Sequence, residues 1–259
     1  MVVNYGLELK KWQLLTISFE KRTTKQALGD ILHGLMAGIF TPFMIGDFLG
    51  RSLGFKVRNR SLAVASNFFN SMAQSLIAIF LGTCALCIWY FGYEVPYKKW
   101  LLVILIVMSL ATILGLFFIL KLNISWDFVK KISFLKKFTV PTLTELEIEN
   151  VLRIKILGFS VLRNLVFFLQ FYLVLLAFGL QIPFDLAFIG INFIFLLKTV
   201  GGGLNILGDL SIRELVGINF FGYYNYDPTS ILVATFLVWF LNIFLPVLFV
   251  IINPRFFKR

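Results

Sequence analysis

Charged and metal-binding residues are scarce in this 259-residue chain. Aspartate, glutamate, lysine and arginine together make up 14% of it, against about 25% in an ordinary soluble domain. Histidine occurs once and cysteine twice, so we expect neither a metal site nor a disulfide framework. Apolar residues make up 59% of the chain, and the mean hydropathy is +0.89. This composition predicts a polytopic integral membrane protein and excludes an ordinary soluble domain.

Acidic residues are the rarer of the two charged kinds, with 13 against 24 lysines and arginines, which gives a net charge of +11. In a soluble protein this excess would favour nucleic acid as a partner. Here the basic residues gather between apolar segments, where they orient the chain and meet anionic lipid headgroups, so we expect no nucleic-acid partner. The chain also has no nucleophile–base set, phosphate-binding loop or zinc-ligand helix motif. We therefore expect neither an enzyme nor a cofactor.

Long apolar runs predict an all-α fold with four clear transmembrane helices, because about 20 apolar residues cross a bilayer. These runs are residues 61–92, 100–120, 157–180 and 229–252. Residues 7–25 are amphipathic and basic, which predicts an interfacial helix. The other basic segments are residues 51–60, a 121–155 loop and the C-terminal tail. The positive-inside rule places these segments in the cytoplasm, with the chain in the cell (inner) membrane.

Two segments of intermediate hydropathy remain, residues 26–50 and residues 186–224. The first lies between two basic cytoplasmic stretches, and the second begins and ends on the outside, so each returns to the side from which it starts. Each is expected to be a re-entrant hairpin or a helix pair, and the two open from opposite faces. This is the pattern of an inverted repeat with broken helices.

Each of these two segments carries the motif Gly-Asp-x-x-x-Arg, as "GDFLGR" at residues 46–51 and "GDLSIR" at residues 208–213. On a helix, the aspartate and arginine of one motif share a face. Charges inside a membrane indicate a functional site by default. The motifs therefore predict two halves of one polar site that binds an anion, although each pair can instead be a local clamp at the membrane interface. The charged candidates are Asp47, Arg51, Asp209 and Arg213.

Further residues complete the predicted site. Arg163 belongs to a polar stripe on the 157–180 span, and Glu214 follows the second motif. A glycine-rich stretch can break the helix there, so that freed backbone N–H groups point at an anion. The glycines concerned are Gly201, Gly202, Gly203 and Gly208. Other polar stripes, which include Asn67 and Asn70 on one span and Thr235 and Asn242 on another, are expected to face the interior of the helix bundle.

These motifs resemble those of the flippase-like membrane domain found in lysylphosphatidylglycerol synthases. The family's first motif, an apolar run with Pro followed by Gly-Asp or Gly-Glu and a nearby Arg, is matched by "GIFTPFMIGDFLGRSLG". Its second motif, Pro-Gly-Gly-x-Gly-x-Arg-Glu, is matched in part by "LGDLSIRELVG", through Gly208, Arg213 and Glu214. This chain departs from the second motif at three residues. Leu207 stands where proline is common in the family, and Asp209 and Ser211 stand where glycine is common.

The resemblance covers roughly residues 10–252. It implies an inner-membrane protein that moves an anionic phospholipid or a lipid-linked glycan intermediate between leaflets, without the synthase domain. The implied partners are membrane lipids, together with a membrane-protein partner or a second copy of the chain. Two other functions stay open: a secondary transporter of a small solute or ion, and a non-transporting partner of an envelope glycosyltransferase or assembly complex.

Overall fold

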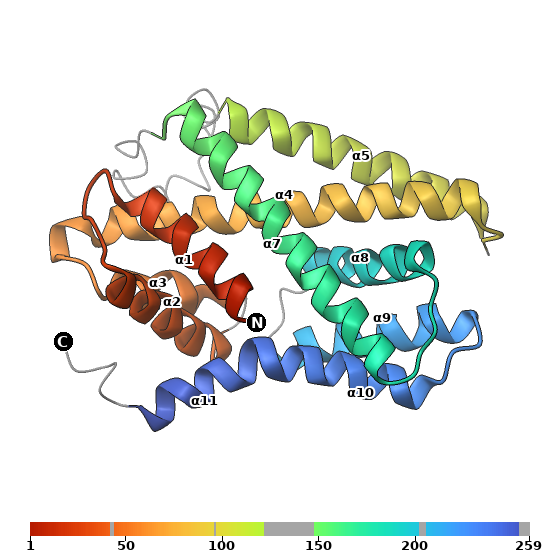
Figure 1. Ribbon diagram of the computed structural model, residues 1–259. Coiled ribbons are helices and arrows are strands. Elements are labelled where there is room, and N and C mark those ends of the chain that lie inside the picture. The colour runs from red at the N-terminus through yellow and green to blue at the C-terminus, as the bar shows by residue number, and fades with distance from the viewer. Residues whose placement is uncertain (42–43, 96, 122–147, 202–205, 254–259) are drawn as a thin grey trace.

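The computed structural model describes residues 1–41, 44–95, 97–121, 148–201 and 206–253, and every regular element within them is a helix (Figure 1). In chain order these are α1 (Val2–Thr16), α2 (Thr24–Ile39), α3 (Ile45–Ser52), η2 (Val57–Asn59), α4 (Arg60–Gly92), α5 (Lys98–Leu120), α7 (Asn150–Ala177), α8 (Phe184–Gly201), α9 (Ile206–Tyr223), α10 (Pro228–Trp239), η5 (Phe240–Phe244) and α11 (Leu245–Ile252). The helical fold class is confirmed. Most of the predicted 121–155 loop lies outside the described residues.

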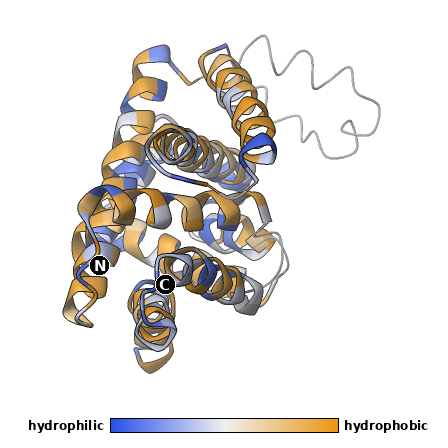
Figure 2. Cartoon of the chain, turned by 90° about the vertical axis from the view of Figure 1, so that its right-hand side faces the viewer, coloured by the Kyte–Doolittle hydropathy of each residue, from blue (hydrophilic) through white to orange (hydrophobic). Residues whose placement is uncertain are grey.

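Five helical stretches are long and apolar enough to cross a membrane: Val57–Gly92, Lys98–Leu120, Asn150–Ala177, Phe184–Gly201 and Pro228–Ile252. In Figure 2, most of the length of the helices has the orange colour of hydrophobic residues. Three residues of α5 are buried, and most of the large apolar side chains of this helix are exposed. Such a surface requires lipid around it. The chain is therefore a multi-pass membrane protein, and α8 adds one helix of spanning length to the four that we predicted.

The two segments that we predicted as hairpins or helix pairs each form two helices in contact. α2 packs along α3, and α8 packs along α9. In Figure 1, the α2–α3 pair opens toward the left and the α8–α9 pair toward the right, so the ends of α2 and α8 point toward the middle of the molecule. The inverted repeat itself stays a prediction. The re-entrant position of the pairs in a bilayer stays a prediction.

Glycines allow α2 and α3 to pack closely. Gly34 and Gly38 on α2 face α3, while Gly46 and Gly50 on α3 face α2. Both helices thus present the glycine spacing of four that permits close approach of membrane helices. A Cβ atom on Gly50 would lie 2.6 Å from the carbonyl oxygen of His33, which is backbone and cannot turn aside. The first charged motif is therefore held against α2 by glycine contacts.

We expect Gly50→Ala to lower the free energy of unfolding by about 1–3 kcal/mol, because α2 and α3 must separate to admit the methyl group. Gly29→Ala on α2 is the matched control, since a Cβ atom there meets nothing within 4 Å. The control should be neutral or stabilising by up to about 1 kcal/mol. Denaturant unfolding in detergent compares the two variants, and equal stabilities would contradict the close packing.

Pro246 shapes the last membrane-spanning stretch. Proline has no backbone N–H, so the carbonyl group of Asn242, four residues earlier, loses its helical partner. The π-helical turn η5 lies at this point of the chain. Tyr5 on α1 donates its hydroxyl group to the freed carbonyl of Asn242 at 2.9 Å. This bond joins α1 to the stretch that contains α10, η5 and α11.

α1 differs from the interfacial helix that we predicted over residues 7–25. It begins at Val2 and ends at Thr16, and its polar side chains Asn4, Glu8 and Lys11 are buried. α1 packs against α7, α2 and α4. The prediction assumed that the polar face of an amphipathic helix lies toward water. Here the neighbouring helices supply charged partners, so the polar face of α1 lies toward the protein interior.

Candidate functional site

Side chains from four helices meet at the carboxylate of Glu8, which is 1% exposed. Its Oε1 accepts hydrogen bonds from Arg51 Nη1 on α3 at 2.6 Å and from Asn70 Nδ2 on α4 at 2.8 Å. Its Oε2 accepts a hydrogen bond from Arg163 Nη1 on α7 at 2.8 Å. Lys11 Nζ, one turn along α1, lies 3.9 Å from the same oxygen. One carboxylate thus holds three other helices to α1.

Further hydrogen bonds extend this arrangement. Arg51 Nε donates to Asp47 Oδ1 at 3.0 Å, and Asn67 Nδ2 donates to Asp47 Oδ2 at 2.8 Å. Arg163 Nε donates to Asn4 Oδ1 at 2.6 Å. We call these residues the central charge cluster; its members are Glu8, Lys11, Asp47, Arg51 and Arg163 with the amides of Asn4, Asn67 and Asn70.

The central charge cluster has more positive than negative charge. It contains three basic and two acidic side chains, so its formal net charge is +1. Burying charges costs several kcal/mol per ion unless partners compensate them. Each arginine has a carboxylate partner here, whereas Lys11 has one ion pair at 3.9 Å and a hydrogen bond to Gln74 at 3.2 Å. The cluster is therefore suited to an additional negative charge.

Some buried amide atoms of the cluster have no hydrogen-bond partner within the described part of the chain. These atoms are Asn4 Nδ2, Asn67 Oδ1 and Asn70 Oδ1. Leaving such an atom unpaired costs about 1–3 kcal/mol. Buried polar atoms of this kind ordinarily bind water or a ligand. Within the described residues, the cluster thus has both a hydrogen-bond donor and hydrogen-bond acceptors that can bind a further group.

The second predicted pair also forms. Arg213 Nε donates to Asp209 Oδ2 on α9 at 3.0 Å, and Lys198 Nζ on α8 lies 3.3 Å from Asp209 Oδ1. The side chain of Lys198 is 36% exposed, so water weakens this second ion pair. Arg163 is close enough to Lys198 for their positive charges to repel each other. Arg163, a member of the central charge cluster, is thus within electrostatic range of Lys198 on α8, which pairs with Asp209 on α9.

Both predicted Asp–Arg pairs thus form, but their surroundings differ. Arg51 and Arg213 share no partner among the described residues, whereas Arg51 and Arg163 share Glu8. Glu214 makes no hydrogen bond or ion pair with Arg213 in the described structure, because successive helical residues point about 100° apart. Glu214 is half-buried on another face of α9.

The predicted glycines fall in and around the α8–α9 connection. Gly201 is the last residue of α8, where a Cβ atom would meet one side-chain carbon of Ile212 at an ordinary 3.5 Å. Gly208 lies in the first turn of α9. Gly202 and Gly203 lie outside the described residues. Packing therefore does not require glycine at residue 201.

Burial confirms the interior position that we predicted for Asn67, Asn70, Thr235 and Asn242. Asn67 and Asn70 on α4 are buried, and so are Ser160 on α7 and Thr235 and Asn242 on the last stretch. Their burial follows from the cost of exposing amides and hydroxyls to lipid, where no water can bind them. The interior of the helix bundle therefore contains polar side chains at these residues.

Three functional candidates were missed in the sequence: Glu8, Lys11 and Lys198. Glu8 and Lys11 lie within the predicted interfacial helix, and Lys198 belongs to neither of the predicted charged pairs. A usable signal was present, since Asn4, Glu8 and Lys11 follow one another at the spacing of a single helix face. An acidic residue on such a face, in a chain with few acids, indicates a buried cationic partner.

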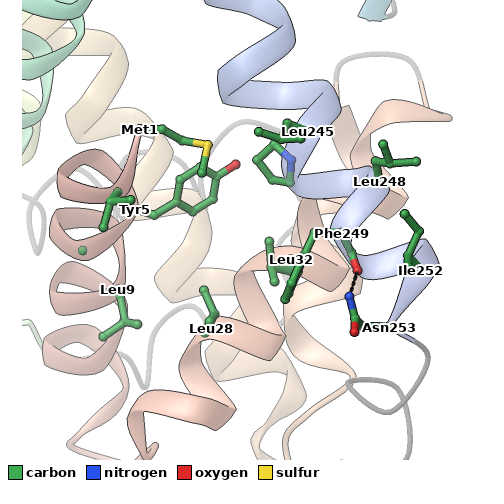
Figure 3. Close-up of a pocket in the computed structure, with 13 residues that line it drawn as sticks. Met1, Tyr5, Leu9, Leu28, Leu32, Leu245, Leu248, Phe249, Ile252 and Asn253 are labelled. Carbon is green, nitrogen blue, oxygen red and sulfur yellow. Dashed lines mark hydrogen bonds between the residues drawn. The ribbon is translucent and has the colours of Figure 1, made fainter.

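An apolar groove of ≈ 690 Å³ lies between α1, α2 and α11 (Figure 3). Figure 3 shows Leu9, Leu28 and Leu248 among the side chains that line it. Val2, Tyr5, Gly6 and Leu9 form the groove face of α1, whereas Asn4, Glu8 and Lys11 form the face toward the central charge cluster. Tyr5 lies within electrostatic range of both arginines of the cluster. α1 thus separates the apolar groove from the charges.

Comparison of the chain with protein-family models, with curated proteins and with solved structures finds no match. The resemblance to the flippase-like domain therefore stays a prediction drawn from the two motifs.

Proposed function

We propose that the protein is a lipid translocase that moves an anionic phospholipid or a lipid-linked glycan intermediate between membrane leaflets. One observation carries this proposal: a buried charge cluster with a net positive charge lies one helix away from an apolar groove that reaches the surface at Phe249 and Ile252. A lipid combines the same two chemistries in one molecule. A small hydrophilic solute has no need of the groove.

The charged residues have distinct roles in the proposed mechanism. Arg51, Arg163 and Arg213 bind the headgroup phosphate, because a guanidinium group offers two parallel hydrogen-bond donors to an oxyanion. Asp47 and Asp209 orient their arginines and neutralise them between transport events. The two helix pairs open from opposite sides, which gives the headgroup an approach to the arginines from either leaflet.

Reconstituted vesicles test this function. Purified protein in proteoliposomes should accelerate the exchange of a fluorescent anionic lipid between leaflets, detected with a quencher that does not cross the membrane. A zwitterionic lipid with the same acyl chains is the control, and we expect slower exchange for it. Exchange no faster than in protein-free vesicles, across several anionic headgroups, would rule out a translocase.

The proposed orientation places the basic residues 51–60 and the C-terminal tail in the cytoplasm of the cell (inner) membrane. In a chain without Cys84 and Cys87, Lys56→Cys should react with an impermeant maleimide in inside-out vesicles, and Thr229→Cys should react in intact cells. Both positions are exposed. Reaction of both from the same side would contradict the proposed topology.

A further inference from the structure

The donors around Glu8 form a receptor for an oxyanion. Arg51, Asn70 and Arg163 come from three different helices, and each places one N–H group within 2.6–2.8 Å of the Glu8 carboxylate. These are distances of strong hydrogen bonds to a charged acceptor. α3, α4 and α7 hold the donors, and the carboxylate itself belongs to α1.

α1 also supplies the other hydrogen-bond partner of Arg163. Within the described residues, Arg163 bonds to Asn4 and to Glu8, and both are on α1. Arg51 differs, because Asp47 on its own helix stays beside it. Displacement of α1 would therefore leave the half-buried Arg163 without a carboxylate partner and favour the binding of a new anion.

The apolar groove supplies room for such a displacement. It lies on the face of α1 opposite the charges, and Gly6 on this face has open space around it. A hydrogen bond from Tyr5 to the backbone carbonyl of Asn242 ties this part of α1 to the stretch on the other side of the groove. Figure 3 shows the space between α1 and α11.

We propose that Arg51, Asn70 and Arg163 are the binding site for the phosphate of an anionic lipid headgroup, and that the Glu8 carboxylate occupies this site until α1 moves into the groove. The inference rests on the proposed function, because it takes the anion to be part of a lipid. In this account, Glu8 stands in for the substrate and keeps the arginines neutralised between transport events.

Small-anion rescue tests the site without any transport measurement. Glu8→Ala removes the carboxylate and leaves the three donors in place. Formate, which has the carboxylate alone, should stabilise this variant relative to chloride at equal ionic strength. A concentration ten times the Kd should raise Tm by about 3–6 °C, with little change in the wild-type chain. The double variant Glu8→Ala/Arg163→Met is the control, and its rescue should be lost.

A second comparison identifies the source of the anion. Glu8→Ala should have a higher Tm in nanodiscs of phosphatidylglycerol than in nanodiscs of phosphatidylcholine, and this difference should exceed that of the wild type. Rescue by formate or inorganic phosphate without the lipid difference would overturn the assignment to a lipid headgroup. A variant that formate does not stabilise, folded or not, would overturn the site itself. Rescue together with absent lipid exchange would instead contradict the proposed function.

Discussion

Glu8→Ala is expected to lower the free energy of unfolding by about 3–5 kcal/mol, because it leaves the half-buried Arg163 without a carboxylate partner and the buried Arg51 with Asp47 alone. Glu8 accepts hydrogen bonds from Arg51, Asn70 and Arg163, so its loss affects the contacts of α1 with three helices at once. Thermal or denaturant unfolding of the purified protein in detergent, with chloride as the only anion, measures the effect.

Glu94→Ala is the matched control for this prediction. Glu94 is exposed beyond the end of α4, so the same substitution there should change stability by no more than about 0.5 kcal/mol. A free energy of unfolding for Glu8→Ala within about 1 kcal/mol of the wild-type value would contradict this prediction. The carboxylate would then not hold the central charge cluster together, and the assignment of α1 to the bundle interior would fail.

Arg163→Met is expected to slow the exchange of anionic lipid in proteoliposomes by about tenfold or more. A hydrogen bond to a charged group contributes about 1.5–3 kcal/mol, and each 1.4 kcal/mol corresponds to about a tenfold change. Methionine keeps an unbranched apolar stem but removes every donor. Arg163→Lys should give an intermediate rate, since lysine restores the charge without the planar fork.

Lys155→Met removes the same charge from an exposed position on the same helix, and its exchange rate should stay near that of the wild type. Elution of each variant as a single folded species in size-exclusion chromatography separates lost function from lost structure. Equal exchange rates for Arg163→Met and Lys155→Met would remove Arg163 from the proposed site.

Local spacing was enough to predict the pairs within one helix. Asp47 with Arg51, and Asp209 with Arg213, are each four residues apart, and both pairs form at 3.0 Å. The burial of Asn67 followed from its place on a polar stripe. Such features depend on helical periodicity, which the sequence contains directly.

Contacts between distant segments could not be derived in this way. Glu8 and Arg163 are 155 residues apart, and no periodicity relates them. The orientation of α1 was also ambiguous, since an amphipathic helix buries its polar face when its neighbours are charged and exposes that face when water is near. The partnership of Lys198 with Asp209 depends on how α8 and α9 pack, which the separate segments do not specify.

Native mass spectrometry of the purified protein can show whether the central charge cluster binds an anionic lipid. We expect phosphatidylglycerol, added in detergent, to bind the wild-type chain in preference to phosphatidylcholine, and we expect Arg163→Met to lose this preference while Lys155→Met keeps it. Equal binding of the two lipids to the wild type, or an unchanged preference in Arg163→Met, would contradict this prediction.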